Sequence, residues 1–419
     1  MSLAPIIALD PLLVGDIGLA EVLIVLLKTL VAFGLLLVSV IFMIWFERKL
    51  ISDFQNRVGP NKAGPWGLFQ TLADGLKLIM KEDLIPDKAD RRVFILAPFL
   101  SAVPAFVTFA VVPIGGGFDG EKFGAIHLFG HDTFVQLADP PIGVLLVLAM
   151  SSVAVYGVML AGWASGSKWP LLGAVRGTAQ MVSYEAALGL AVVAVVLLSG
   201  SLSTHDIVVA QSGSGYEVLG SFGLPRWNLI ATGLVPFVIF LIAATAELNR
   251  PPFDLVEAEQ ELVGGFHTEY SSFRFALFYL AEFMNTITMS AIIVTLFFGG
   301  PAGPLWFGPG WLSGIIWFTL KLFVFLFVFV WIRSTLPRFR YDQLMSIGWK
   351  VLIPLGFGWL LLLGAINVGR DEGWNMVVVV AVSLVVLVVA WAGLTAAVEV
   401  ARRRRLLAAA EDAEEEVLV

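Results

Sequence analysis

The residues best suited to chemistry in this sequence are glutamates within or beside long apolar stretches. Glu185, Glu247 and Glu282 each interrupt or bound a stretch that is otherwise almost free of charge. An ionised carboxylate is costly in such surroundings, so each is expected to be paired with a cation, hydrated or protonated. Four further acids are crowded into one segment: Glu257, Glu259, Glu261 and Glu269. Because like charges also favour the protonated form, these carboxyls are candidates for proton exchange near neutral pH.

A passive interpretation of these acids stays open. Glu257, Glu259 and Glu261 could form a solvated acidic loop. Glu282 fits a passive role less well, because it lies about ten residues inside its apolar stretch. Lys321 is equally deep in another stretch and could be its partner.

A second group of candidates combines cationic and aromatic side chains between the apolar stretches. The possible hydrogen-bond donors to a polar ligand are Arg48, Arg57, Arg250 and Arg333. The possible lining of an apolar passage is Trp66, Phe253 and Phe273. A passage for a long apolar ligand needs such a lining and a few polar groups at its end. Each arginine could equally be a snorkelling anchor at the level of the lipid phosphates.

The elements that position these residues are predicted to be membrane-spanning helices. Hydrophobic residues make up 58% and charged residues 14%, and the mean hydropathy is +0.88. A chain with this composition has too few polar residues to cover the surface of a water-soluble protein. Apolar runs recur that are long enough to cross a hydrocarbon core of roughly 30 Å as helices. A membrane barrel would show alternating segments of about ten residues instead, and this pattern is absent. We therefore expect an all-α transmembrane bundle.

Nine spans are predicted, near residues 22–46, 93–114, 141–162, 178–199, 228–248, 273–298, 311–333, 347–366 and 375–398. Of the 26 Lys and Arg residues, 21 fall in connections on one face and three on the other. The positive-inside rule makes the rich face cytoplasmic, with the N-terminus outside and the C-terminus inside. On the cytoplasmic face, an apolar stripe between residues 68 and 80 predicts an amphipathic helix, lying in the membrane interface or packed on the spans.

The sequence predicts no redox centre within this chain. It has no cysteine, which excludes disulfides, zinc-thiolate sites and iron-sulfur clusters held by the chain itself. The four histidines are scattered at His127, His131, His205 and His267, and the first three fall in predicted loops. We expect any redox chemistry to be housed in a partner, with no metal and no flavin here.

Four segments on the predicted cytoplasmic face contain nearly all the unusual residues. They are residues 47–78 with RVGP at 57–60 and GPWG at 64–67, 162–185 beginning GWASGSK, 246–271 with AELNRPPFD at 246–254, and 333–350 beginning RSTLPR. In order and on one face, these segments resemble the signature stretches of the H subunit of NADH-quinone oxidoreductase, which is the membrane protein that joins the two arms of respiratory complex I. The resemblance covers roughly residues 21–363.

The resemblance implies a function and its residues. A protein of this family would form the entrance and tunnel through which a quinone leaves the membrane to be reduced by the hydrophilic arm. Residues 1–366 would form the eight-helix body, 367–400 an additional transmembrane helix and 401–419 a charged cytoplasmic tail. The residues implied for the tunnel are Glu47, Arg48, Arg57, Trp66, Arg250, Phe253, Asp254 and Arg333. The residues implied for a proton or charge relay are Glu185, Glu247, Glu257, Glu259, Glu261, Glu269 and Glu282.

The resemblance also implies partners and has exceptions. The partners would be the quinone-site subunits of the hydrophilic arm, neighbouring membrane-arm subunits, lipid and quinone, in the plasma membrane and without nucleic acid. Gly166, Trp169 and Phe283 replace residues usual in the family, Asn for the first and Tyr for the other two, so we expect no polar role at these positions. The ninth span and the cluster Arg402 to Arg405 lie beyond the family's eight-helix body.

Two other functions remain as alternatives. The homologous membrane subunit of an energy-converting hydrogenase shares parts of these motifs. A stand-alone secondary transporter would use Glu282, Lys28 and Lys321 as an ion path. The complete set of four segments favours the quinone oxidoreductase.

Overall fold

The computed structural model describes most of the chain. The described residues are 10–13, 18–118, 124–212, 216–217, 223–224, 226–257, 259–304, 309–375, and then 378–383, 385–386, 388–389, 392–393, 396 and 399–400. The chain divides into two compact units, Met1–Ile353 and Pro354–Val419.

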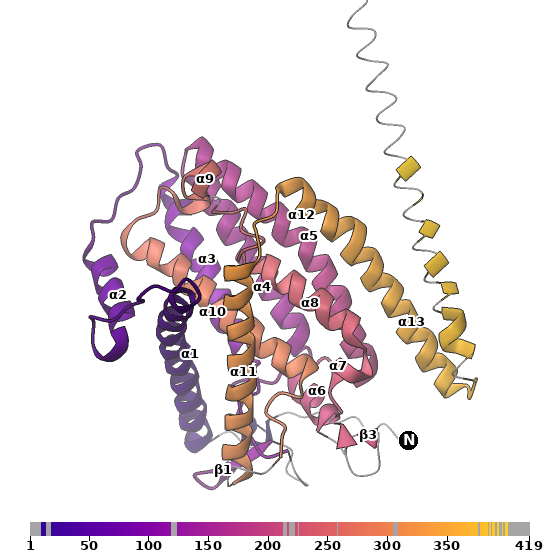
Figure 1. Ribbon diagram of the computed structural model, residues 1–419. Helices are drawn as coiled ribbons and strands as arrows, with labels where there is room; N and C mark the ends of the chain where they lie inside the picture. Colours follow the sequence, from indigo (N-terminus) through magenta and orange to yellow (C-terminus); the bar gives the residue numbers. More distant parts are fainter. Residues whose placement is uncertain are drawn as a thin grey trace, which may run out of the picture. The chain divides into compact units, whose positions relative to one another are not determined.

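Long apolar helices dominate the described residues, as the composition predicted (Figure 1). Seven are long and apolar enough to cross a membrane: α1 (Leu19–Phe54), α3 (Arg91–Phe109), α4 (Gly143–Ala164), α5 (Lys168–Ser199), α10 (Ser272–Phe297), α11 (Gly310–Thr335) and the helix Tyr341–Asp371. The last comprises α12 (Tyr341–Ile347), a π-helical turn (Gly348–Leu352) and α13 (Ile353–Asp371). A shorter apolar helix, α8 (Leu234–Glu247), lies at the predicted fifth span. The prediction of an all-α transmembrane fold is confirmed.

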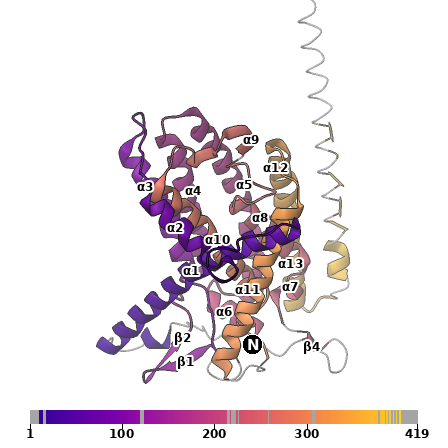
Figure 2. The same ribbon diagram turned by 60° about the vertical axis from the view of Figure 1, so that its left-hand side comes forward.

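Short elements connect these helices. They are α2 (Gln70–Met80), α6 (Thr204–Gln211), α7 (Asn228–Ala231), α9 (Glu259–Leu262), and single 3-10 turns at Pro11–Leu13, Pro65–Gly67 and Gly265–His267. Two small antiparallel hairpins pair β1 (Ala125–Leu128) with β2 (His131–Phe134) and β3 (Tyr216–Glu217) with β4 (Gly223–Leu224). Helices α9 and α12 lie at one end of the first unit, and β1 and β2 lie at the other (Figure 2). The third and fourth predicted cytoplasmic segments, which contain α9 and α12, therefore lie at the same end (Figure 2).

Helix α10 forms the centre of the first unit, where it contacts α1, α2, α3, α5, α8 and α11. Within its most apolar window 83% of the residues are buried, against 17% for α1 and 28% for α11. The exposed side chains of α1 and α11 are mostly Leu, Val and Phe. Such surfaces are stable against lipid tails, so these two helices form the periphery of the bundle.

The start of α5 corrects one predicted connection. Residues 163–178 were expected to form a loop, but the helix begins at Lys168, so Glu185 lies near its middle rather than opening a span. Gly166 has φ +65° and Ser167 is extended, which confines the turn after α4 to three residues. Pro170 is tolerated because it lies in the first helical turn, where its missing N–H is not needed. The helix simply extends beyond its apolar part.

The fifth span is also shorter than predicted. The expected helix over 228–248 is divided into α7 and α8, because Gly233 between them has φ +80° and ψ 170°, outside the helical range. Helix α8 ends at Glu247, as predicted. This division leaves 14 residues in α8.

The two lysines within spans have local partners. Lys321 Nζ donates to the carbonyl oxygens of Phe298, Gly300 and Ala302 at 2.7 to 2.9 Å, rather than approaching Glu282. The suggested Lys321–Glu282 pair is therefore wrong, because the free carbonyls after the end of α10 attract the ammonium group instead. Lys28 binds Asp10 at 2.7 Å.

The predicted amphipathic helix is confirmed as α2. Its apolar residues Leu72, Leu76, Ile79 and Met80 are exposed. Thr71 Oγ1 donates to the carbonyl of Ile41 on α1 at 3.3 Å, so α2 is fixed to that helix while its apolar stripe remains available to lipid.

The ninth crossing stays a prediction, tested by the side on which the C-terminus lies. The described residues from 378 to 400 are helical, whereas Arg402 to Arg405 and the tail 401–419 lie outside the described residues. Moving four arginines across the membrane costs on the order of 2.5 to 3.5 kcal/mol each at the bilayer centre. A cytoplasm-active fluorescent reporter fused after Val419 should therefore fluoresce, whereas one fused after Asp371 should remain dark. The same response from both fusions would contradict a crossing between them.

Candidate functional site

A buried arginine is at the centre of the candidate site. Arg250 follows the end of α8 and is only 1% exposed. Its Nη1 donates to Glu47 Oε2 of α1 at 2.7 Å, and its Nε lies 3.6 Å from Glu282 Oε1 of α10. The guanidinium also lies over the ring of Phe283, 4.9 Å from the ring centroid. The chain thus neutralises a buried cation with two carboxylates and an aromatic face.

Glu47 joins three helices at this point. Its second carboxylate oxygen accepts a hydrogen bond from Arg333 of α11, whose side chain is partly exposed. Glu47 itself is buried. Because the carboxylate lies between two guanidinium groups, α1, α11 and the segment after α8 are held together by one charge cluster, which consists of Glu47, Arg250, Glu282 and Arg333. These are four of the residues that the sequence selected.

A second ion pair lies beside this charge cluster. Asp254 is buried and accepts a hydrogen bond from Arg338 at 2.6 Å. Burial raises the pKa of Asp254, and this effect outweighs the opposing effect of the Arg338 guanidinium. Phe253 is buried between Tyr184 and Phe339, with ring centroids at 5.4 and 5.5 Å. The AELNRPPFD segment is therefore a packed part of the protein rather than a solvated loop.

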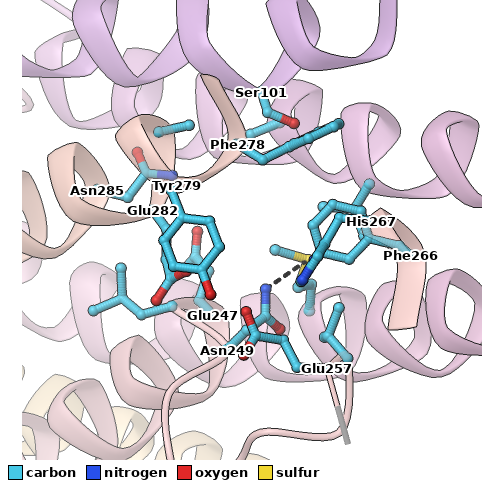
Figure 3. Close-up of a pocket in the computed structure, with 16 residues that line it drawn as sticks. Ser101, Glu247, Asn249, Glu257, Phe266, His267, Phe278, Tyr279, Glu282 and Asn285 are labelled. Atoms are coloured by element: carbon cyan, nitrogen blue, oxygen red, sulfur yellow. Dashed lines mark hydrogen bonds between the residues drawn. The ribbon is translucent and has the colours of Figure 1, made fainter. Parts of the chain in front are cut away.

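A small polar cavity adjoins the charge cluster (Figure 3). Its volume is about 60 Å³, which is room for several water molecules. Its polar lining is Ser101, Glu247, Asn249, Glu257, His267, Tyr279, Glu282 and Asn285. The side-chain oxygens Glu247 Oε2 and Ser101 Oγ are buried and have no hydrogen-bond partner among the described residues. Unpaired buried oxygens in a cavity of this size fit a hydrated interior.

A second cavity, of about 30 Å³, continues from the first toward the interior of the bundle. The two share Glu247 and Asn285 in their linings, and Thr288 and Ser151 face the second one. The hydroxyl of Thr288 is buried without a hydrogen-bond partner among the described residues. Polar groups thus continue past Glu247 into the bundle.

Two serines of α4 hold two of the carboxyls. Ser151 Oγ donates to Glu247 Oε1, and Ser152 Oγ donates to Glu185 Oε1. Neither glutamate has a cationic partner among the ion pairs of the described residues. The three span glutamates therefore divide into one beside an arginine, Glu282, and two held by neutral hydroxyls.

The remaining predicted residues are dispersed. Arg48 pairs with Asp74 at 2.5 Å, where burial opposes ionisation but hydrogen bonds from Arg48 and Gln70 lower the pKa of Asp74 overall. Glu261 pairs with Arg176 at 2.6 Å and is exposed. Arg57, Trp66 and Phe273 are exposed, with Trp66 at 71%. Glu269 is half-buried outside the cavity lining. The side chain of Glu259 lies outside the described residues.

Several residues of the site were not predicted from the sequence. Ser101, Ser151, Ser152 and Asn285 are short polar residues in apolar helices, and adjacent serines in an otherwise apolar run were the only signal. His267 was set aside as an isolated histidine, yet it lines the cavity between Phe266 and Tyr279. Only the packing of four helices brings these groups to one place.

His267 provides a test of the cavity's environment, because burial lowers its pKa to about 4. The ordinary value near 6.5 applies to the unfolded chain. Between these values only the unfolded chain binds the proton, so stability falls as the pH falls through this window, by about 3 kcal/mol in full. His267→Gln should therefore lose less thermal stability than the wild type when the purified protein is taken from pH 7 to pH 5. The exposed His127, changed to Gln, serves as the control. Equal acid sensitivity of wild type and His267→Gln would contradict a neutral buried imidazole.

Comparison with known proteins gives a consistent assignment. The model of the family described as NADH dehydrogenase matches residues 27–364. The H subunit of NADH-quinone oxidoreductase from Frankia casuarinae is 53% identical over 350 residues, 82% of this chain and 73% of the relative. The H subunits from Frankia alni and Streptomyces avermitilis are 52% and 48% identical, over 83% and 84% of this chain and 74% and 75% of their own lengths. The chain therefore belongs to the NADH dehydrogenase family, among the proteins named as the H subunit of NADH-quinone oxidoreductase.

Proposed function

We propose that this multi-pass membrane protein is the subunit of a proton-translocating NADH:quinone oxidoreductase that forms the quinone entrance and tunnel and couples quinone reduction to proton movement. One observation carries the proposal. Glu282 belongs to the charge cluster around Arg250 and also lines the cavity that Glu247 lines. A change of charge at the cluster can therefore alter the protonation of Glu282, whose cavity extends into the membrane-spanning part of the bundle.

The entrance is framed by α1, α2 and α10. Trp45 Nε1 of α1 donates to the carbonyl of Trp66 at 3.0 Å, and Ser272 Oγ of α10 donates to the carbonyl of Leu78 at 3.1 Å. These contacts support α2 at the membrane surface with its apolar stripe exposed. An isoprenoid tail needs such an apolar approach, and the exposed ring of Phe273 extends it.

The quinone headgroup is the reacting part of the substrate. Its reduction adds two electrons and two protons and yields the quinol. The electrons come from partner subunits of the hydrophilic arm, and this chain supplies a tunnel and charged groups near its end. Arg333 and Arg338 are partly exposed at the predicted cytoplasmic face and are suited to donate hydrogen bonds to the headgroup oxygens. Asp254, whose pKa is raised, is suited to exchange a proton there.

The relay is the second half of the proposal. Glu282 lies beside Arg250 and lines the cavity together with Glu257 and Glu247, and Glu185 lies in the middle of α5, where Ser152 binds it. Water in the cavity would connect the carboxyls of Glu282, Glu257 and Glu247. Copurification separates this function from its alternatives. Subunits with flavin and iron-sulfur clusters in the purified complex would support the quinone oxidoreductase. A nickel-iron subunit would indicate a hydrogenase, and a protein that purifies alone would indicate a transporter.

The tunnel part of the proposal is tested with Asp254→Asn, which keeps the size and removes the titration. Quinone-dependent NADH oxidation of the assembled complex should fall by about 10²-fold or more, as for loss of an acid-base group. Electron transfer to a hydrophilic acceptor should be nearly unchanged. The exposed Asp342, changed to Asn, is the matched control. Equal loss of both activities in Asp254→Asn would contradict a role confined to the quinone end, as would unchanged quinone reduction.

The relay is tested with Glu282→Gln, which keeps the volume but cannot ionise. Proton pumping by the complex in vesicles should fall more steeply than quinone reduction, because the link between charge cluster and cavity is lost. The exposed Glu82, changed to Gln, provides the comparison. Normal pumping in an assembled Glu282→Gln complex would remove this residue from the relay.

A further inference from the structure

Two adjacent serines of α4 bind carboxyls from two different helices. Ser151 donates to Glu247 at the end of α8, and Ser152 donates to Glu185 in the middle of α5. Consecutive helical residues point about 100° apart. One turn of α4 therefore lies between the two carboxyls and contacts both.

The two carboxyls interact with each other. When both are ionised, the charge of Glu185 acts on Glu247 with an unfavourable Coulomb energy. Neither carboxyl takes part in an ion pair of the described residues. Because one turn of α4 contacts both carboxyls, a proton gained or lost by one changes the electrostatic field at the other.

Hydroxyl groups suit a pair that shares one proton. A serine hydroxyl can donate one hydrogen bond and can also accept. Ser152 Oγ lies 3.1 Å from the carbonyl oxygen of Leu148, in addition to its contact with Glu185. When Glu185 is ionised, the hydroxyl donates to it. When Glu185 is protonated, its O–H can donate to Ser152 Oγ while the serine hydrogen turns to Leu148.

Ser151 occupies a complementary position. It holds one oxygen of Glu247, a residue that lines both cavities, and leaves the other oxygen, Oε2, without a hydrogen-bond partner among the described residues. A proton arriving through cavity water can reach Oε2 while Oε1 stays fixed by Ser151. Glu247 thus has one oxygen fixed by α4 and one oxygen that is buried and free to accept or carry a proton.

We infer that Ser151 and Ser152 are positioning residues that make the protonation states of Glu247 and Glu185 interdependent. In the step that they support, the O–H bond of Glu247 breaks and an O–H bond forms on Glu185, so the total charge of the pair is unchanged. The inference rests on the proposed relay and adds to it the two hydroxyls and the lateral step from α8 to α5. Glu185 is half-buried and lies next to the exposed Val182 and Ala186, so this step brings the proton toward the side of the bundle.

The test replaces each serine within the whole complex. Ser151→Ala and Ser152→Ala each remove a hydrogen bond to a charged group, which should shift the protonation equilibrium of the carboxyl by roughly ten- to hundredfold. Pumped protons per electron should fall while quinone reduction is largely retained. The infrared C=O bands of protonated carboxyls, recorded as the complex is reduced, should shift in both variants.

Conservative variants distinguish positioning from a general structural defect. Ser151→Thr and Ser152→Thr keep the hydroxyl and should restore both the proton ratio and the infrared bands. The cavity of about 30 Å³ beside Ser151 has room for the added methyl group. Ser199→Ala is the matched control, because Ser199 Oγ donates only to backbone carbonyls.

Three outcomes would overturn the inference. These are normal proton ratios in both alanine variants, infrared bands unchanged from wild type, and no rescue by threonine. Glu185→Gln and Glu247→Gln separate this result from failure of the proposed function. If the glutamine variants lose pumping and the alanine variants keep it, the serine inference alone fails. If the glutamine variants also pump normally, the relay itself fails.

Discussion

The guanidinium of Arg250 is the group on which the rest of the site depends. It is almost completely buried, so its charge requires carboxylates at close range. Glu47 and Glu282 provide them from α1 and α10, and Glu47 also binds Arg333 of α11. Removal of one partner from such a buried pair costs about 3 to 5 kcal/mol, because the other charge is left uncompensated. The charge cluster thus links the segment after α8 to α1, α10 and α11, and α1 and α11 belong to the lipid-facing periphery.

The carboxyls beyond the charge cluster have a different environment. Glu282 lies beside an arginine, whereas Glu247 and Glu185 are held by serine hydroxyls and have no cationic partner among the described ion pairs. A neutral hydroxyl stabilises an ionised carboxylate less than a guanidinium does, so Glu247 and Glu185 lack the electrostatic stabilisation that Arg250 gives Glu282. In the proposed relay, this difference would let a charge change near Arg250 alter the protonation of groups deeper in the bundle.

The other ionisable groups of the spans serve the architecture. Lys321 binds three carbonyls after the C-terminal end of α10, and Lys28 binds Asp10 and Thr133 near β2. These groups lie in separate clusters and do not connect to Glu282 through any of these contacts. The stand-alone transporter, for which Lys28, Lys321 and Glu282 would form one ion path, therefore finds no support in these contacts.

The sequence by itself determined the helical membrane class, the approximate places of the seven long apolar helices and the family, because apolar length and contiguous motifs are local properties of the chain. It also selected Glu47, Arg250, Glu282 and Arg333, since charged residues are rare in such surroundings. It could not determine which charges pair or where every helix begins: Lys321 was suggested as a possible partner of Glu282, and the first residues of α5 were expected to form a loop. The tertiary structure decided these points, together with the cavity and the contacts of Ser151, Ser152 and His267. Partners more than 90 residues apart, such as Ser151 and Glu247, meet only through helix packing, which local patterns do not encode.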